Sequence, residues 1–345
     1  MQTLRDNNAT PPDALNEDWR FGRPHLYAAH LLRLLEAAPA QAGVLEASLP
    51  AAPPCPGADT PAAFPSIGSG YLVQRALAAG ATRLSLRLEE NSSAEAPVRI
   101  RCEASGLFLP WLEVVVAPGV QAHVVEQHSH RGASALLCLR RYTILPGASL
   151  ALELREEGSG ESRALNISHI RCVGNCRVRH ITTHANHSWA REETTAELTQ
   201  DAGEAPELLL LSANSLRDKQ VLDQRTLQLH TCPGAKSRLL YKNVLDENAT
   251  AVFGGNIRVE PGAHETDAYL SHLNLMLSED AAVHTLPGLE ILADRVRCSH
   301  GSACAPMDAE QLFYLLSRGI GEAAARAMLA EGFLSNVWEQ FATPS

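Results

Sequence analysis

The 345-residue chain has few cysteines, no long apolar run and no concentration of basic residues, and each shortage excludes a class of protein. Its 8 cysteines are too sparse for a disulfide scaffold and are expected to be thiols or ligands in a reducing compartment. The first residues, 1–20, are polar, and no apolar run approaches the roughly 20 residues of a membrane-spanning helix. We therefore expect a cytoplasmic protein that has no signal peptide and is not inserted in a membrane.

The charge of the chain limits the kinds of partner that it can bind. The formal net charge is -10, and the 29 lysines and arginines are not clustered as phosphate binding requires. Neither nucleic acid nor an anionic membrane surface is an expected partner.

Motifs of nucleotide binding and hydrolysis are absent as well. The run 233–237, PGAKS, lacks the spacing of a phosphate-binding loop, and the chain has no Gly-x-Ser-x-Gly elbow or His-Glu-x-x-His pair. We expect no nucleotide bound by this chain and no enzyme activity.

A repeat of turns is present instead. Gly119, Gly147, Gly174, Gly234 and Gly262 follow one another at intervals of 28, 27, 60 and 28 residues, so one period fits if a single turn lacks its glycine. An alternating strand follows each glycine and supplies one inward apolar residue in two. This pattern favours a stacked parallel β-helix over a β-sandwich, whose turns would recur every 8–12 residues without a longer period.

Composition divides the chain into four parts. We expect an N-terminal helical region (1–49), a proline-rich linker (50–70), the β-helix core (71–305) and a C-terminal helical region (306–345). Asp308 begins a helix with a capping-box-like pattern that Gly319 can end. In the next helix an apolar row either packs against its own chain or binds a partner; the row is Leu329, Phe333, Val337 and Phe341.

A stretch rich in cysteine and histidine spans residues 172–187. Spacing by four places four potential zinc ligands on one face of a helix or strand, namely Cys172, Cys176, His180 and His184. On a strand, however, residues four apart are separated by about 13 Å and cannot share one ion. The alternatives are a stand-alone metal-binding β-solenoid that uses this stretch, and a ladder of solvent-facing histidines.

A second group, Cys298, His300 and Cys304, lies in the run VRCSHGSACAPMD, residues 296–308. On a strand Cys298 and His300 share a side and lie about 6–7 Å apart, which suits neighbouring ligands or an interface pair. An iron–sulfur cluster takes four protein ligands, so another chain would have to complete such a site. The alternative is a packed thiol beside a hydrogen-bonded histidine.

Residues 239–320 closely resemble the core of the SufB/SufD family of iron–sulfur cluster assembly proteins. Within the family the chain is most similar to the SufD branch, on the run RCSHG followed by DAEQLFYLLSRGI. The N-terminal EDWRFGRP also resembles a SufD segment. The resemblance implies a right-handed parallel β-helix between N-terminal and C-terminal α-helical regions.

The resemblance also implies a non-catalytic scaffold subunit of a SufB–SufC–SufD complex. SufB would pair with the end of the β-helix, where Cys298 and His300 would meet a transient iron–sulfur cluster, and the isolated chain could form a homodimer through this surface. Cys304 stands where the family has an aliphatic residue, so it inherits no role. The SufC ATPase would bind the C-terminal helices through Leu312, Phe313, Leu316, Leu329, Phe333 and Val337.

Overall fold

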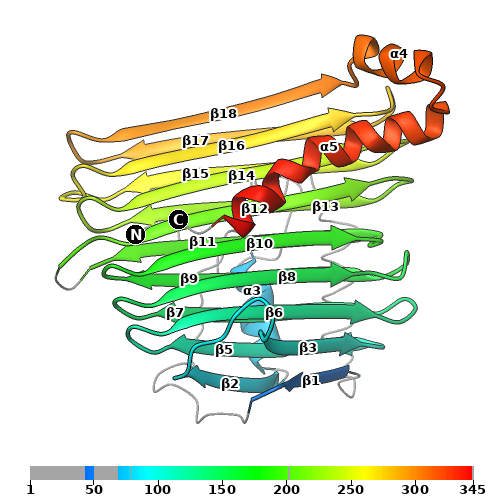
Figure 1. Ribbon diagram of the computed structural model, residues 1–345. Helices are drawn as coiled ribbons and strands as arrows, with labels where there is room; N and C mark the ends of the chain where they lie inside the picture. Colours follow the sequence, from blue (N-terminus) through cyan, green and yellow to red (C-terminus); the bar gives the residue numbers. More distant parts are fainter. Residues whose placement is uncertain (1–42, 50–68, 79, 201–202, 344–345) are drawn as a thin grey trace.

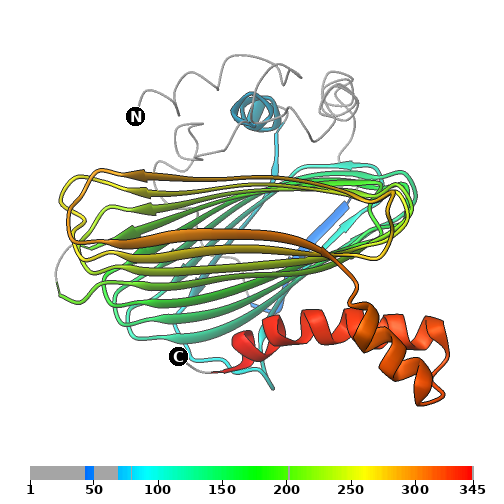
Figure 2. The ribbon, with the colours of Figure 1, turned by 90° about the horizontal axis from the view of Figure 1, so that it is seen from above.

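Two sheets of parallel strands, stacked rung upon rung, form a flattened solenoid (Figures 1 and 2). The structure is a computed structural model that describes residues 43–49 and 69–343 except 79, 201 and 202. Sheet A contains β1 (Gly43–Ala47), β3 (Val98–Ala104), β6 (Gln121–His130), β8 (Ser149–Glu157), β10 (Arg177–Ala185), β12 (Glu207–Leu216), β14 (Lys236–Leu245), β16 (Asp267–Met276) and β18 (Arg297–Pro306). Sheet B contains β2 (Thr82–Leu88), β4 (Leu107–Phe108), β5 (Pro110–Val116), β7 (Ala135–Ile144), β9 (Arg163–Val173), β11 (Trp189–Thr199), β13 (Val221–His230), β15 (Thr250–Val259) and β17 (Ala282–Ile291).

The chain alternates between the sheets, so each strand pairs with the strand two further along the sequence through most of the solenoid. All of these pairs are parallel except β1 with β3, which is antiparallel. The predicted parallel β-helix is therefore confirmed.

The repeating turns explain the period of the sequence. The five predicted turn glycines all have positive φ, between 61° and 90°, a conformation that glycine adopts without steric cost. The expectation that one turn lacks its glycine is wrong: Gly203, with φ of 88°, lies between Gly174 and Gly234 and divides their long interval in two.

Every second residue of a strand points between the sheets, and these residues stack in columns from rung to rung. In one column Val124, Leu152, His180, Leu210 and Leu239 follow each other in register. All five are buried, and the largest apolar cluster runs through successive rungs. Burying such columns supplies about 25 cal/mol for each Å² of apolar surface removed from water, which holds the rungs together.

The described part of the predicted N-terminal helical region, residues 43–49, contains a strand and no helix. Residues Gly43–Ala47, within the predicted segment 1–49, form strand β1, because they pair with the edge of β3. The rest of the predicted helical region, residues 1–42, lies outside the described residues, as does almost all of the linker predicted at 50–70. Helix α3 (Gly70–Ala78) lies on the side of the solenoid opposite the C-terminal helices (Figure 2).

Two C-terminal helices follow the last strand, α4 (Ala309–Ser317) and α5 (Glu322–Ala342). Asp308 caps α4 by accepting hydrogen bonds from the backbone amides of Glu310 and Gln311, and Gly319 ends it with a φ of 82°. Helix α5 then runs back across β10, β12 and β14 (Figure 1). No helix among the described residues is long and apolar enough to cross a bilayer.

Candidate functional site

The solenoid ends in an incomplete rung made of β17 and β18, each of which pairs with only one strand within the described chain. Leu289 and Ile291 of β17 continue two interior columns, directly above Ile257 and Val259. Those two lower residues are fully buried, whereas Leu289 and Ile291 are each 40% exposed. The end thus presents unpaired backbone edges together with core-type side chains, which is the composition of a surface that another strand or chain can cover.

Cys298 and His300 lie on this end rung, on β18. Their register partners on β16 are Ala268 and Leu270, both buried, so the two side chains continue interior columns. Cys298 is half-buried against the apolar core, and this burial raises the pKa of its thiol. His300 is exposed. One face of the last strand therefore offers a thiol and an imidazole to whatever covers the end.

Cys304 also reaches this end, through a column of amides that the sequence interpretation missed. Asn214 donates to Asn243 at 2.8 Å, and Asn243 donates to Asn274 at 3.1 Å. Asn274 Nδ2 lies 3.7 Å from the Cys304 sulfur, which is exposed. The signal was present in the sequence, because these positions recur at the period of the turns, with intervals of 29, 31 and 30 residues.

The cysteine and histidine stretch does not form one site. Cys172 and Cys176 face each other across a turn inside the largest apolar cluster. His180 stacks between Leu152 and Leu210, and His184 bonds to Glu192 through Nε2 at 2.8 Å. Cys172 lies near the end of β9, Cys176 lies in the turn that follows, and His180 and His184 lie along β10, so the four residues are spread out and the candidate zinc site is not formed.

The alternative of solvent-facing histidines is also wrong. His180, His184 and His187 are 2%, 3% and 4% exposed. His180 and His184 lie at alternate positions of β10 that point between the sheets, and the turn after β10 directs His187 to the same space. Burial lowers the pKa of His180 to about 4 and that of His187 to about 3, so both rings are neutral near pH 7. His184 has its partner in Glu192, and Nδ1 of His187 lies 3.1 Å from Oγ of Ser162.

A buried ionic cluster lies in the rungs below these histidines. Glu156 Oε2 lies 2.9 Å from Nδ1 of His128, whose Nε2 lies 2.6 Å from Glu126. Glu126 also accepts from Arg140 and from the hydroxyl of Tyr142. Burial opposes protonation of His128, but the two carboxylates outweigh it and raise its pKa to about 9. The sequence interpretation missed this cluster.

Protonation of the neutral His180 makes the fold acid-sensitive. Its pKa is lower in the fold, about 4, than in an unfolded chain, about 6.5, so the unfolded state binds more protons in between. Stability therefore falls as the pH drops from about 6.5 to about 4, by about 3 kcal/mol for this one group. We predict that His180→Leu, which extends the Leu152 and Leu210 column, loses less free energy of unfolding over this range in urea titrations. Parallel pH profiles for both proteins would contradict the prediction.

The C-terminal residues predicted to bind a partner divide into two groups. Phe313 and Leu316 of α4 are 72% and 39% exposed, and Leu312, Leu329 and Phe333 are half-buried. Val337 is fully buried and, with Phe341, packs on Ile181 and Leu211 of the sheet. This end of the apolar row on α5 therefore attaches the helix to its own chain, and Val337 is not available to a partner.

Sheet side chains fix α5 further. Arg179 donates to the carbonyl oxygens of Phe341 and Thr343, both at 2.7 Å, at the carbonyl end of the helix dipole. Lys242 donates to the carbonyl oxygen of Phe333 at 2.8 Å. The helices thus occupy a defined position beside the open end, with α4 farther from the solenoid than α5 (Figure 2).

Sequence comparison places the chain in a family. Residues 100–333 match the family model for the core domain of SufB and SufD in the SUF system of iron–sulfur cluster assembly. The matched segment includes most of the solenoid, the open end and α4. The chain belongs to the SufBD family, whose role is iron–sulfur cluster assembly.

Curated relatives agree. The chain is 38% identical to the iron–sulfur cluster assembly protein SufD of Escherichia coli over 141 residues, 41% of this chain and 33% of that protein. It is 31% identical to a SufBD family protein of Mycobacterium leprae over 223 residues, 62% of this chain and 56% of the relative. A SufBD family protein of Synechocystis is 35% identical over 144 residues, 42% of this chain and 32% of the relative. The match spans between about a third and just over half of these relatives, and the chain is SufD-like within the family.

Proposed function

We propose that the chain is a non-catalytic scaffold subunit of a SufB–SufC–SufD complex, in which it takes the SufD position in the cytoplasm. SufB would cover the open end of the solenoid, and the SufC ATPase would dock on the C-terminal helices. The nascent iron–sulfur cluster is the cargo of the complex. The observation that carries this proposal is the end rung, where unpaired strands, exposed core-type side chains and the pair Cys298 and His300 coincide.

The end rung supports pairing with another β-helix rather than with a small ligand. Two unpaired edges, β17 and β18, offer backbone hydrogen bonds, and a row of large apolar side chains rims them. A second solenoid with a complementary end would continue both sheets and cover this rim. The rim residues are Leu286, Leu289, Ile291 and Leu292, each at least 40% exposed.

Cys298 and His300 supply half of a cluster site at such a junction. A thiolate and an imidazole are ligand types found in iron–sulfur proteins, and a cluster takes four protein ligands. The partner would add the other ligands. The same end could join two copies of the chain when SufB is absent, since the unpaired edges are present in either case.

Copurification tests the complex. Coexpressed with SufB and SufC from the same genome, the chain should elute with both proteins in one complex. A chain that elutes alone, or only with itself, in the presence of both proteins would refute the proposal.

We predict that His300→Ala leaves the fold intact and lowers the yield of clusters assembled by the complex. The side chain is exposed and its removal leaves no cavity, so the stability change should stay within about 0.5 kcal/mol. The measurement is reconstitution of the purified complex with iron and sulfide, followed by absorption spectroscopy. Ser299→Ala on the same strand is the matched control and should assemble clusters normally. An unchanged cluster yield in His300→Ala would remove His300 from the mechanism.

A further inference from the structure

Three metal-ligating side chains converge where successive rungs of sheet A end at one edge of the solenoid. His130 is the last residue of β6, Glu156 is the next to last of β8, and His187 lies in the turn between β10 and β11. One ligand atom from each lies within 4.8 Å of the others. The Nε2 atoms of His130 and His187 lie 3.0 and 3.9 Å from Oε1 of Glu156, and no side chain of the three is more than 3% exposed.

A buried hydroxyl holds each imidazole from behind. Nδ1 of His130 lies 3.0 Å from Oγ of Ser134, and Nδ1 of His187 lies 3.1 Å from Oγ of Ser162. When Nδ1 carries the hydrogen and donates it to the serine, the lone pair of Nε2 faces Glu156. A hydrogen bond from the ring nitrogen that does not bind the metal is the usual means by which proteins orient histidine ligands. Nε2 of His187 has no hydrogen-bond partner among the described residues, although it is buried.

The surrounding interior is rich in buried carboxylates. Glu126, Glu156 and Glu192 are all buried there, with the guanidinium of Arg140 beside Glu126. A cation bound to Glu156 would compensate part of this buried negative charge.

We propose that His130, Glu156 and His187 bind one divalent first-row transition ion of the zinc or ferrous type. Imidazole and carboxylate suit these ions, and two histidines with one carboxylate form a known three-ligand set with an open position. Ligand bonds of about 2.0–2.2 Å place tetrahedral ligands about 3.4 Å apart, which lies within the observed range of separations. The ion would join the ends of three rungs, so its role is structural.

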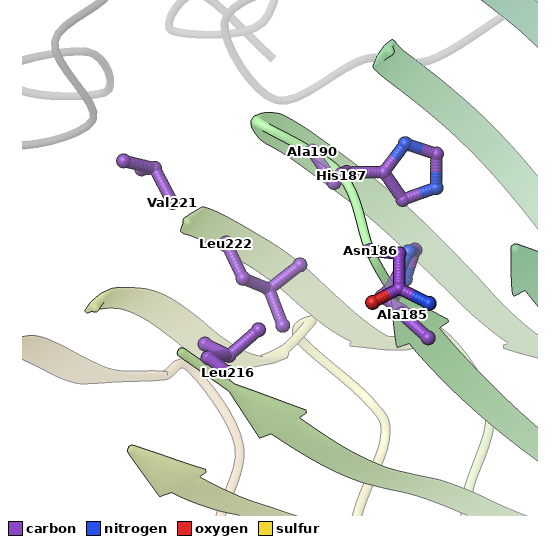
Figure 3. Close-up of a pocket in the computed structure, with 8 residues that line it drawn as sticks. Ala185, Asn186, His187, Ala190, Leu216, Val221 and Leu222 are labelled. Carbon is purple, nitrogen blue, oxygen red and sulfur yellow. The ribbon is translucent and has the colours of Figure 1, made fainter. Parts of the chain in front are cut away.

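A small cavity borders His187 and is also lined by Asn186 and Leu222 (Figure 3). Neither His130 nor Glu156 lines this cavity, so it is not the open position of the ion. The neighbouring trio of Glu126, His128 and Cys138 is a weaker site, because Arg140 and Tyr142 already occupy the Glu126 carboxylate and the guanidinium would repel a cation.

Metal analysis of the full chain tests the site. Tag-free protein is unfolded in denaturant that contains EDTA, which removes bound metal. It is then refolded with zinc chloride, or anaerobically with ferrous ion, and excess metal is removed by gel filtration. We expect about one ion per folded chain by mass spectrometry and a rise in Tm. Cobalt in place of zinc should give visible absorption bands of a low-symmetry site. Ions held by surface histidines would wash out and leave Tm unchanged.

Variants separate the site from general effects on folding. Glu156→Gln and His187→Gln should lose the ion, and Ser162→Ala, which keeps all three ligands, should weaken binding about 10- to 100-fold. The control is His230→Gln, since His230 is a buried histidine bonded to Ser237 at 2.9 Å with no carboxylate beside it. It should keep the ion. A folded wild type that binds no ion, or a Glu156→Gln variant that binds as well as wild type, would overturn the proposal. Neither readout requires SufB, SufC or cluster assembly.

Discussion

Replacing Arg191 by methionine is expected to destabilise the fold by about 3–5 kcal/mol. The side chain is fully buried on β11 and donates to Glu193 at 2.8 Å and to Asp223 at 2.6 Å. Glu193 also accepts from Ser69, which directly precedes α3, and Arg225 donates to Asp223 at 2.7 Å. Removing Arg191 leaves two carboxylates and one guanidinium in a buried site. Urea unfolding followed by circular dichroism measures the loss.

Two further variants identify the cause of this loss. Arg191→Lys keeps the charge but not the forked geometry that reaches both carboxylates, so its stability should lie between those of wild type and Arg191→Met. Arg87 and Glu89 form an ion pair of similar length, 2.9 Å, with side chains 48% and 68% exposed. Arg87→Met should therefore cost less than about 1 kcal/mol. Equal losses in the buried and exposed variants would show that burial does not determine the cost.

The solenoid could be predicted from the sequence because its turns are chemically explicit. Proline followed by glycine marks one edge of successive rungs, and the alternation of apolar residues marks the inner face. The other edge carries a weaker signal, since glycine has the positive φ at Gly132 and Gly160 but Asn186, Asp218 and Glu247 have it in the later turns. Strand β1 was also hidden, because a strand of 5 residues paired only along one edge carries little pattern.

The interior polar residues could not be predicted in the same way. On an isolated strand, His128 and Glu156 look like solvent-facing residues, since both are polar and so are their neighbours along the chain. Only the register places Glu156 over His128, and it does so from rungs 28 residues apart. The spacing by four within residues 172–187 was misleading for the same reason: proximity in a solenoid follows the rung period, not the distance along one strand.

At the C-terminus, the sequence predicts which apolar residues share one helix face better than it predicts whether a partner can reach that face. The periodicity of α5 identified Val337 and Phe341 as one apolar face, but did not tell whether a partner or the protein's own sheet covers it. Ile181 and Leu211, on β10 and β12, decide the matter by packing against that face. Under the proposed function, the exposed side chains of α4 are therefore the surface expected to bind SufC.

Removing the apolar side chains of α4 is expected to cost the complex its ATPase. In the double variant Phe313→Ala with Leu316→Ala, SufC binding should weaken by at least about 30-fold, the equivalent of about 2 kcal/mol for a lost hot spot. The two residues lie three apart and therefore on one side of the helix. They are 72% and 39% exposed, so the stability of the chain itself should change by less than about 0.5 kcal/mol. Calorimetric titration with SufC measures the affinity.

Val337→Ala is expected to lower the stability of the chain and largely keep its affinity for SufC, the opposite of the α4 variant. The side chain is buried between α5 and the sheet, so its truncation should cost about 2 kcal/mol of stability, while α4 keeps its whole exposed surface. SufC affinity should then fall only as far as α5 loosens from the sheet. Deletion of residues 309–345 removes both helices and should abolish binding. If the deletion still binds SufC, or if Val337→Ala weakens binding more than the α4 variant does, the docking surface lies elsewhere on the chain.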